Sequence, residues 1–265
     1  FLLFPNFIFI EYWTYLGPIK FLYLFILCIW NGFVFHYLTL FIHAAAHFNI
    51  HPNNRRLNDI VANFLLVYYF LMPIKTYRKK HFKHHKYIGT SKDPENSYKY
   101  NLSFSNFLKW FFFYFAIKKL WFMFYQKNRN FRNLDSQILF SIIIFSLIHF
   151  LFLGYSYYNY TFEFYFCLLF IPQIMILPVL NWLRTSAEHA PFETSKESFS
   201  LRNFGNDKFL SIIFGAAGFK YHDIHHLNPG IHYLDLPKYK DEYKLKIGLN
   251  YSKVIKKLYL KTKFN

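Results

Sequence analysis

Residues 21–47 read FLYLFILCIWNGFVFHYLTLFIHAAAH, a long apolar run that ends in two histidines four positions apart. No Asp, Glu, Lys or Arg interrupts residues 21–42. A helix that crosses a bilayer needs about 20 predominantly apolar residues, so this run is long enough to span a membrane. The sequence therefore predicts a transmembrane helix that has His43 and His47 at its end.

Three other segments have the same apolar character. Gly17-Pro18 is a turn signal between the first two runs, and the uncharged link GYSYYNYT separates the last two. We expect an all-α integral membrane protein, a single domain over residues 1–265, with its spans in two hairpins. The predicted spans are residues 1–16, 21–42, 136–153 and 162–183.

Two further apolar stretches are less suited to crossing a membrane. Residues 57–74 contain Asn58, Asp59 and Asn63, and residues 104–125 mix Phe and Trp with three lysines. Aromatic and basic residues together are typical of a helix that lies in the membrane interface. We expect residues 57–74 to be interfacial or re-entrant, and residues 104–125 to be interfacial.

Charge indicates the orientation of the predicted spans. The chain has 31 Lys and Arg against 14 Asp and Glu, and all but Lys20 of the basic residues lie in 51–133 or from Arg184 onward. By the positive-inside rule these two regions are cytoplasmic. A nucleic-acid partner is not expected, because no binding motif is present and the charges alternate with membrane-length runs. Attraction to anionic lipid headgroups explains the charge more simply.

Eight of the 13 histidines fall in three tight groups, all of which lie on the predicted cytoplasmic side. The groups are HAAAH with His43 and His47, HFKHH with His81, His84 and His85, and HDIHH with His222, His225 and His226. On a helix, residues three or four apart share a face, so each group directs imidazoles the same way. One such group alone is weak evidence, whereas three on one membrane face predict a metal site.

The ligand types narrow the choice of metal. Eight imidazoles exceed the coordination number of one ion, so two ions are expected. Nitrogen ligands suit Fe, Zn or Cu and argue against Mg and Ca. The segment TSAEH adds His189 on the same side, as the best further ligand. The carboxylates of Asp93, Glu188 and Asp223 either orient metal-bound imidazoles or are simple solvated charges.

The remaining histidines and the cysteines have plainer expected roles. His36 and His149 lie inside predicted spans, where polar side chains usually face other helices. We expect helix–helix hydrogen bonds there. His51 and His232 are expected in loops. The two cysteines, Cys28 and Cys167, lie in apolar runs and are expected to pack there, without a disulfide framework.

The order HxxxH, HxxHH and HxxHH between paired spans resembles the integral-membrane fatty acid desaturase superfamily, which also includes hydroxylases and carotenoid ketolases. The resemblance runs from about residue 30 to residue 240. KDPE after the second group resembles the acidic-Pro turn of the family. HHLNPGIHYLDLPKY resembles the HHL-x-P-x-x-P-Y-x-x-L stretch after the third group, with His232 where Pro is common.

The resemblance implies a di-iron centre, O2 as co-substrate and electrons from a separate carrier. TSAEH is similar to an NSAAH-type segment of the acyl-CoA branch, in which the Asn approaches one iron through a water. Thr185 stands in that place here. The ligands that the resemblance implies are His43, His47, His81, His84, His85, His189, His222, His225 and His226.

The leading functional hypothesis is an oxygen-dependent desaturase that acts on the acyl chain of a lipid in the bilayer. A hydroxylase or ketolase of the same superfamily, acting on a carotenoid or another lipid, is the nearest alternative, because the histidine groups do not separate these reactions. The long stretch after the third group favours the acyl substrate. A metal transporter is a further alternative, but its ligands would lie near the middle of spans.

The electron carrier is expected to be a separate ferredoxin or cytochrome. The chain has no cysteine set for an iron–sulfur cluster and no room for a fused haem domain. Basic residues around the second histidine group are expected to attract an acidic carrier or lipid headgroups. These residues are Arg78, Lys79, Lys80, Lys83 and Lys86.

Overall fold

Helices make up the regular structure of the protein in the computed structural model. The structure describes residues 17–69, 72–112, 114, 136–159, 161–192, 199–205, 207, 209–239, 241 and 248–261. These residues contain no β-strand, only an isolated bridge between Asn203 and Tyr221. The all-α class predicted from the sequence is therefore confirmed. The predicted span 1–16 lies outside the described residues.

Three described helices are long and apolar enough to cross a membrane: Gly17–Ala46, Leu139–Tyr158 and Phe162–His189. They correspond to three of the four predicted spans. The first contains α2 (Lys20–Ala46) and the second belongs to α7 (Ser136–Tyr158). The third consists of α8 (Phe162–Phe164), the π-helical stretches η5 (Tyr165–Phe170) and η6 (Pro172–Ile176), and α9 (Leu177–His189).

The chain divides into two compact units. The first comprises Phe1–Leu38, Leu65–Met72 and Lys109–Leu180, and the second comprises Thr39–Phe64, Pro73–Leu108 and Asn181–Asn265. Helices α2 and α9 therefore contribute residues to both units. The long apolar runs lie mainly in the first unit, and all the histidine groups lie in the second.

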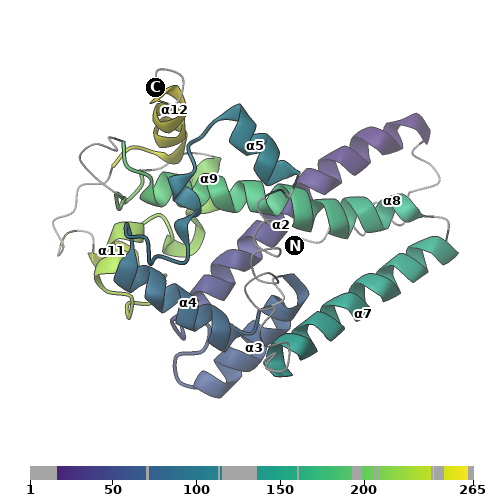
Figure 1. The fold of residues 1–265 in the computed structure, drawn as a ribbon, viewed down its shortest axis with the longest axis horizontal. Helices are drawn as coiled ribbons and strands as arrows, with labels where there is room; N and C mark the ends of the chain where they lie inside the picture. The colour runs from purple at the N-terminus through teal and green to yellow at the C-terminus, as the bar shows by residue number, and fades with distance from the viewer. Residues whose placement is uncertain are drawn as a thin grey trace. The chain divides into compact units, whose positions relative to one another are not determined.

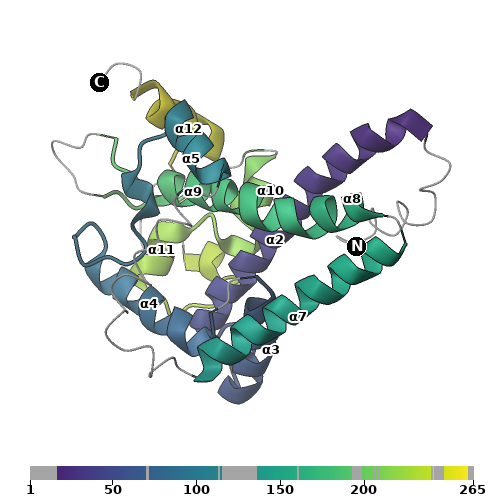
Figure 2. The same ribbon diagram turned by 45° about the vertical axis from the view of Figure 1, so that its right-hand side comes forward.

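In the first unit, α7 and the α8 stretch form a hairpin, visible in both views (Figures 1 and 2). One core cluster of this unit joins Phe35 of α2 to Tyr165 and Leu169 of η5. The imidazole of His149 contacts the Tyr165 hydroxyl at 3.0 Å and the Gln173 side-chain oxygen at 3.1 Å. The predicted helix–helix hydrogen bonding of His149 is thus confirmed.

The second unit is built from shorter helices. They are α3 (Arg55–Tyr69), α4 (Ile74–Tyr87), η3 (Asn96–Lys99), α5 (Phe104–Phe111), α10 (Leu210–Phe214), η7 (Ala216–Gly218), α11 (His222–Leu227), η8 (Leu236–Tyr239) and α12 (Tyr251–Lys261). The last five residues of α3 and the last three of α5 belong to the first unit. One core cluster joins Leu40 and Ala44 of α2 to Phe219, Ile224 and Tyr233. This packing sets the end of α2 beside α11.

The described parts of the two less apolar stretches form short helices, and residues 70, 71, 113 and 115–125 lie outside the described residues. With 15 residues, α3 is only about 22 Å long, which is shorter than a bilayer core of about 30 Å. Helix α5 exposes Phe104 and Leu108, one turn apart, on a single face. The interfacial positions expected for these stretches stay predictions.

Arg78 of α4 anchors the end of α2 and is not a free surface charge. Its guanidinium pairs with Asp59 at 2.6 Å and donates hydrogen bonds to the backbone oxygens of Ala45 and Ala46 at 3.0 and 2.8 Å. The last carbonyls of a helix have no partner within it, and a cation is favoured there. The expectation that Arg78 attracts a carrier is therefore wrong, since its charge is used inside the fold.

Gly218 allows a close approach between η7 and the segment after α11. Its φ is +91°, and a Cβ there would lie 1.9 Å from the backbone oxygen of Tyr233. Only glycine accepts both the left-handed backbone and the contact without strain.

Gly218→Ala is therefore expected to lower the free energy of unfolding by about 2 kcal/mol or more, from backbone strain and overpacking together. Thermal unfolding of the detergent-solubilised protein measures this change. Gly154→Ala in α7 is the matched control, because a Cβ there meets nothing within 4 Å. An unchanged melting temperature in Gly218→Ala would contradict the close approach.

Candidate metal centre

Nine histidines come together in the second unit, all those that the sequence singled out as ligands. His43 lies in the last turn of α2, and His189 is the last residue of α9. The second and third histidine groups lie on α4 and α11, which are neighbours in both views (Figures 1 and 2).

The first histidine group differs from its expected local structure. Helix α2 ends at Ala46, so His43 is helical while His47 lies in the following turn. The chain reverses at Phe48, which has a φ of +61°. The span also runs further than predicted at α9, where the helix continues through TSAEH to His189.

Five histidines form one potential metal site, called here the five-histidine group: His43, His47, His81, His85 and His225. One ring nitrogen from each lies within 4.8 Å of all the others. The Nε2 atom of His81 is 3.0 Å from that of His47 and 3.1 Å from that of His85. Residues from α2, α4 and α11 thus meet at one point.

The other four histidines are called here the four-histidine group: His84, His189, His222 and His226. They belong to two potential metal sites that share His189. The ligand atoms of His84, His189 and His226 lie within 4.8 Å of one another, as do those of Glu188, His189 and His222. The Nε2 atom of His222 is 3.1 Å from those of both His189 and His226. Glu188 approaches His222 Nε2 at 3.7 Å.

These spacings fit metal ligation. Two imidazole nitrogens bonded to one ion at about 2.0–2.1 Å lie roughly 2.9–3.4 Å apart when they are neighbouring ligands, and the observed Nε2 separations are 3.0–3.1 Å. In four imidazoles of the two groups, a buried Nδ1 atom has no hydrogen-bond partner within the described residues. They are His85, His189, His222 and His225. Such atoms are rare and costly in any folded protein.

Burial keeps the imidazoles neutral, which is the form that offers a lone pair to a metal. Burial, and then the neighbouring His81, lower the pKa of His47 to about 2 and that of His85 to about 3. Burial followed by the nearby histidines also lowers the pKa values of His222, His225 and His226 well below the usual value. These five imidazoles are therefore neutral at neutral pH, and each can offer the lone pair of one ring nitrogen.

Two carboxylates contact the second histidine group through its Nδ1 atoms. Asp93 Oδ1 lies 2.9 Å from His84 Nδ1, and Glu95 Oε2 lies 3.2 Å from His81 Nδ1. The Tyr98 hydroxyl and the backbone N–H of Glu95 donate to Asp93 at 2.7 and 2.8 Å. These contacts hold the rings with Nε2 toward the groups, as carboxylates commonly do for metal-bound histidines. Glu95 follows Asp93 in the KDPE turn, but the sequence reading did not single it out.

The other carboxylates and Thr185 have different partners. Glu188 accepts a hydrogen bond from Arg184 Nε at 2.8 Å, within α9. Asp223 has its pKa raised by burial, and within the described residues its carboxylate makes no hydrogen bond to any of the nine histidines. The Thr185 hydroxyl donates to the backbone oxygen of Asn181 at 2.9 Å and lies 2.8 Å from the Ser97 hydroxyl.

Tyr233 is a further neighbour that the sequence reading missed. Its hydroxyl lies against His43 Nδ1 and 3.1 Å from His225 Nε2. The two loop histidines stay outside both groups. His51 is in a turn after α2, and His232 contacts the backbone oxygen of Asn49 at 2.9 Å.

The carboxylate contacts predict which acidic residue matters for metal binding. Asp93→Asn is expected to weaken metal binding by about 10-fold, because His84 loses its charged partner. Titration of the metal-free protein with Co²⁺ measures the affinity. Asp223→Asn is the matched control and is expected to bind like the unchanged protein. Equal losses in both variants would contradict the orientation of His84 by Asp93.

Comparison with known proteins agrees with this geometry. The family model described as fatty acid desaturase matches residues 20–256, which includes all nine histidines. No curated protein and no solved structure matches the chain significantly. Because the family model covers most of the sequence, the chain belongs to the fatty acid desaturase family.

Proposed function

We propose that the protein is an oxygen-dependent di-iron enzyme that inserts a double bond into the acyl chain of a membrane lipid. Membership of the family makes it an oxidoreductase of the desaturase and hydroxylase type. The observation that supports desaturase chemistry at a di-iron centre is the gathering of nine histidines into two adjoining groups. Two groups of this size suit two ions of ordinary coordination number.

The proposed division of ligands follows the contacts. One iron would be held by the five-histidine group and the other by the four-histidine group, with Glu188 as a neighbouring carboxylate. When bound, the irons supply the strong oxidant, formed with O2, that removal of hydrogen from an unactivated methylene requires and that no side chain provides.

Side chains of the protein orient the proposed ligands and shield them from water. Asp93 and Glu95 accept the Nδ1 protons of His84 and His81, so the Nε2 lone pairs are directed into the groups. His43, His84 and His225 are almost fully buried, which keeps water away from a reactive centre. The buried ion pair of Arg184 and Glu188 holds the last turns of α9 and thereby the position of His189.

Desaturation is favoured over oxygen insertion by the stretch after the third histidine group. Residues 225–239, HHLNPGIHYLDLPKY, resemble the sequence typical of members that act on acyl chains. The apolar helices and the family support a lipid substrate that reaches the enzyme from a bilayer. The basic segments around the histidine groups support a cytoplasmic position for the metal centre.

The proposal is tested by removing one histidine from each group. His84→Ala and His225→Ala are each expected to abolish double-bond formation, because a lost ligand leaves its group incomplete. Fatty acid profiles of an expressing host measure the product, and the iron content of the purified protein measures the centre. His51→Ala, outside both groups, is the control and is expected to stay active. Full activity in the two ligand variants would rule the proposal out, and hydroxylated products would replace desaturation by the alternative reaction.

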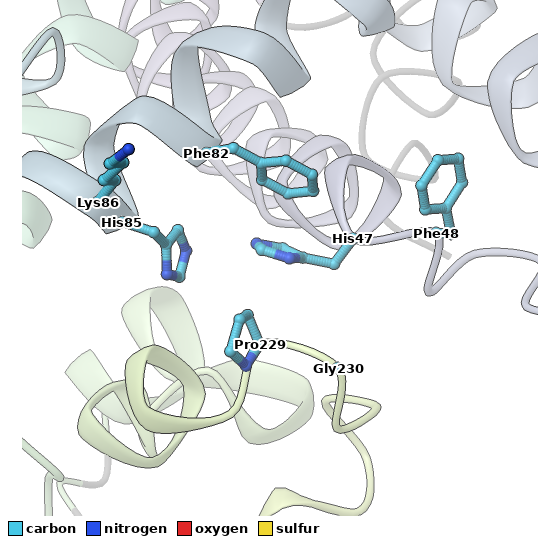
Figure 3. A pocket seen from close by; sticks show the side chains of 7 residues that line it. All are labelled: His47, Phe48, Phe82, His85, Lys86, Pro229 and Gly230. Carbon is cyan, nitrogen blue, oxygen red and sulfur yellow. The ribbon is translucent and has the colours of Figure 1, made fainter.

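The electron carrier is proposed to dock where the five-histidine group comes closest to the surface. A pocket of about 480 Å³ has His47 and His85 in its wall. Figure 3 shows both rings at a gap between Phe82 and Pro229, with Lys86 beside them. An electron delivered here would need to cross only one imidazole to reach an ion held by the five-histidine group.

Charge around the pocket supports an acidic carrier. Lys75, Lys79, Lys83 and Lys86 are all exposed and follow one face of α4 at spacings of three and four residues. The histidines of α4 occupy its opposite, buried face. A stripe of one charge sign attracts a partner of the other sign and speeds its association.

The triple change Lys79→Glu, Lys83→Glu and Lys86→Glu is expected to slow reduction by an acidic ferredoxin about 10-fold or more at low salt. Reduction by dithionite, which needs no docking, should stay unchanged. Stopped-flow absorbance at several ionic strengths measures both rates. The control reverses Lys253, Lys256 and Lys257, which are exposed on α12. Equal slowing in the control would show that net charge, and not the α4 stripe, governs the reaction.

A further inference from the structure

The Tyr233 hydroxyl lies between two histidines that come from opposite ends of the sequence. It contacts Nδ1 of His43, from the first histidine group, and Nε2 of His225, from the third. The side chain is almost completely buried, at 2% exposure. The contact joins α2 to α11 through a polar atom inside the five-histidine group.

The fold holds this hydroxyl from several sides. The Tyr233 ring stacks on Phe219 with a centroid separation of 3.9 Å, and its backbone oxygen lies against Gly218, where a side chain would collide. Just before it, His232 Nε2 donates to the backbone oxygen of Asn49 at 2.9 Å. The segment is thus fixed both to η7 and to the turn after α2.

The chemistry of the contact parallels that of the two carboxylates. His81 and His84 each have an acidic partner at Nδ1, which leaves Nε2 for a metal. His43 Nδ1 has no carboxylate partner within the described residues, and its partner there is the Tyr233 oxygen. A phenol oxygen has two lone pairs and can accept an N–H while its own O–H donates elsewhere.

We propose that Tyr233 is a positioning residue of the five-histidine group, whose oxygen accepts the Nδ1 proton of His43 and so leaves the Nε2 lone pair of His43 for the ion. The inference rests on the proposed metal-binding role of this group. In the metal-free protein the Tyr233 proton is donated to His225 Nε2. Binding of an ion replaces that second hydrogen bond and retains the first.

Tyr233→Phe tests the inference, because it removes the oxygen and keeps the ring that stacks on Phe219. Titration with Co²⁺ is expected to show two bound ions, one of them about 10- to 100-fold weaker than in the unchanged protein. The visible absorption bands of that ion should also shift, since a released His43 ring changes its ligand field. Tyr221→Phe is the matched control. Tyr221 is buried in the same core cluster, and its hydroxyl contacts none of the nine histidines within the described residues.

Thermal unfolding of the metal-free variants separates a folding defect from a metal effect, and similar melting temperatures are expected. Unchanged Co²⁺ affinity and spectrum in Tyr233→Phe would overturn the inference. The inference would also be overturned if the ferric protein showed an intense visible absorption band that Tyr233→Phe lacks. Such a band marks a phenolate bound directly to iron. If the unchanged protein binds no metal, the proposed function itself fails, which is a distinct result.

Discussion

Nine imidazoles must be held in contact inside the protein, and the packing of the second unit around them meets this constraint. A neutral imidazole has one donor and one acceptor nitrogen, so each ring needs its proton directed away from the group. Asp93 and Glu95 take up two of these protons. Burial prevents the alternative, which is protonation of both nitrogens and repulsion between the rings.

Helix ends deliver the histidines to this centre. His43 and His189 lie in the last turns of α2 and α9, which both begin in long apolar sequence. Each residue of a helix turns the next side chain by about 100° and advances it about 1.5 Å. The direction of His43 is therefore set relative to every residue before it in α2. Arg78 binds the carbonyls of Ala45 and Ala46, at the end of α2. His47 lies in the turn that follows.

The sequence predicted most of this arrangement because its signals are local. Span length predicted α2, α7 and the α8–α9 stretch, and repeated spacing predicted which histidines share a face. Asp93 was also found, because a turn of a few residues brings it back to α4. Asp223 shows the limit of that reasoning, since it is adjacent to His222 in sequence but its carboxylate makes no hydrogen bond to a histidine in the part of the chain that the structure describes. Tyr233 could not be found this way, because its partner His43 is 190 positions distant and only the folded chain joins them.

The energetic cost of the centre argues against a purely structural role. A buried polar atom without a partner costs about 1–3 kcal/mol, and a domain is stable by only about 5–15 kcal/mol. Four imidazoles of the two groups each have an Nδ1 in that condition. An apolar core of the same volume would avoid this loss entirely. The cluster is explained if a ligand binds its converging nitrogens in the folded state and does not bind the unfolded chain. The free energy of that binding then adds to the stability of the fold.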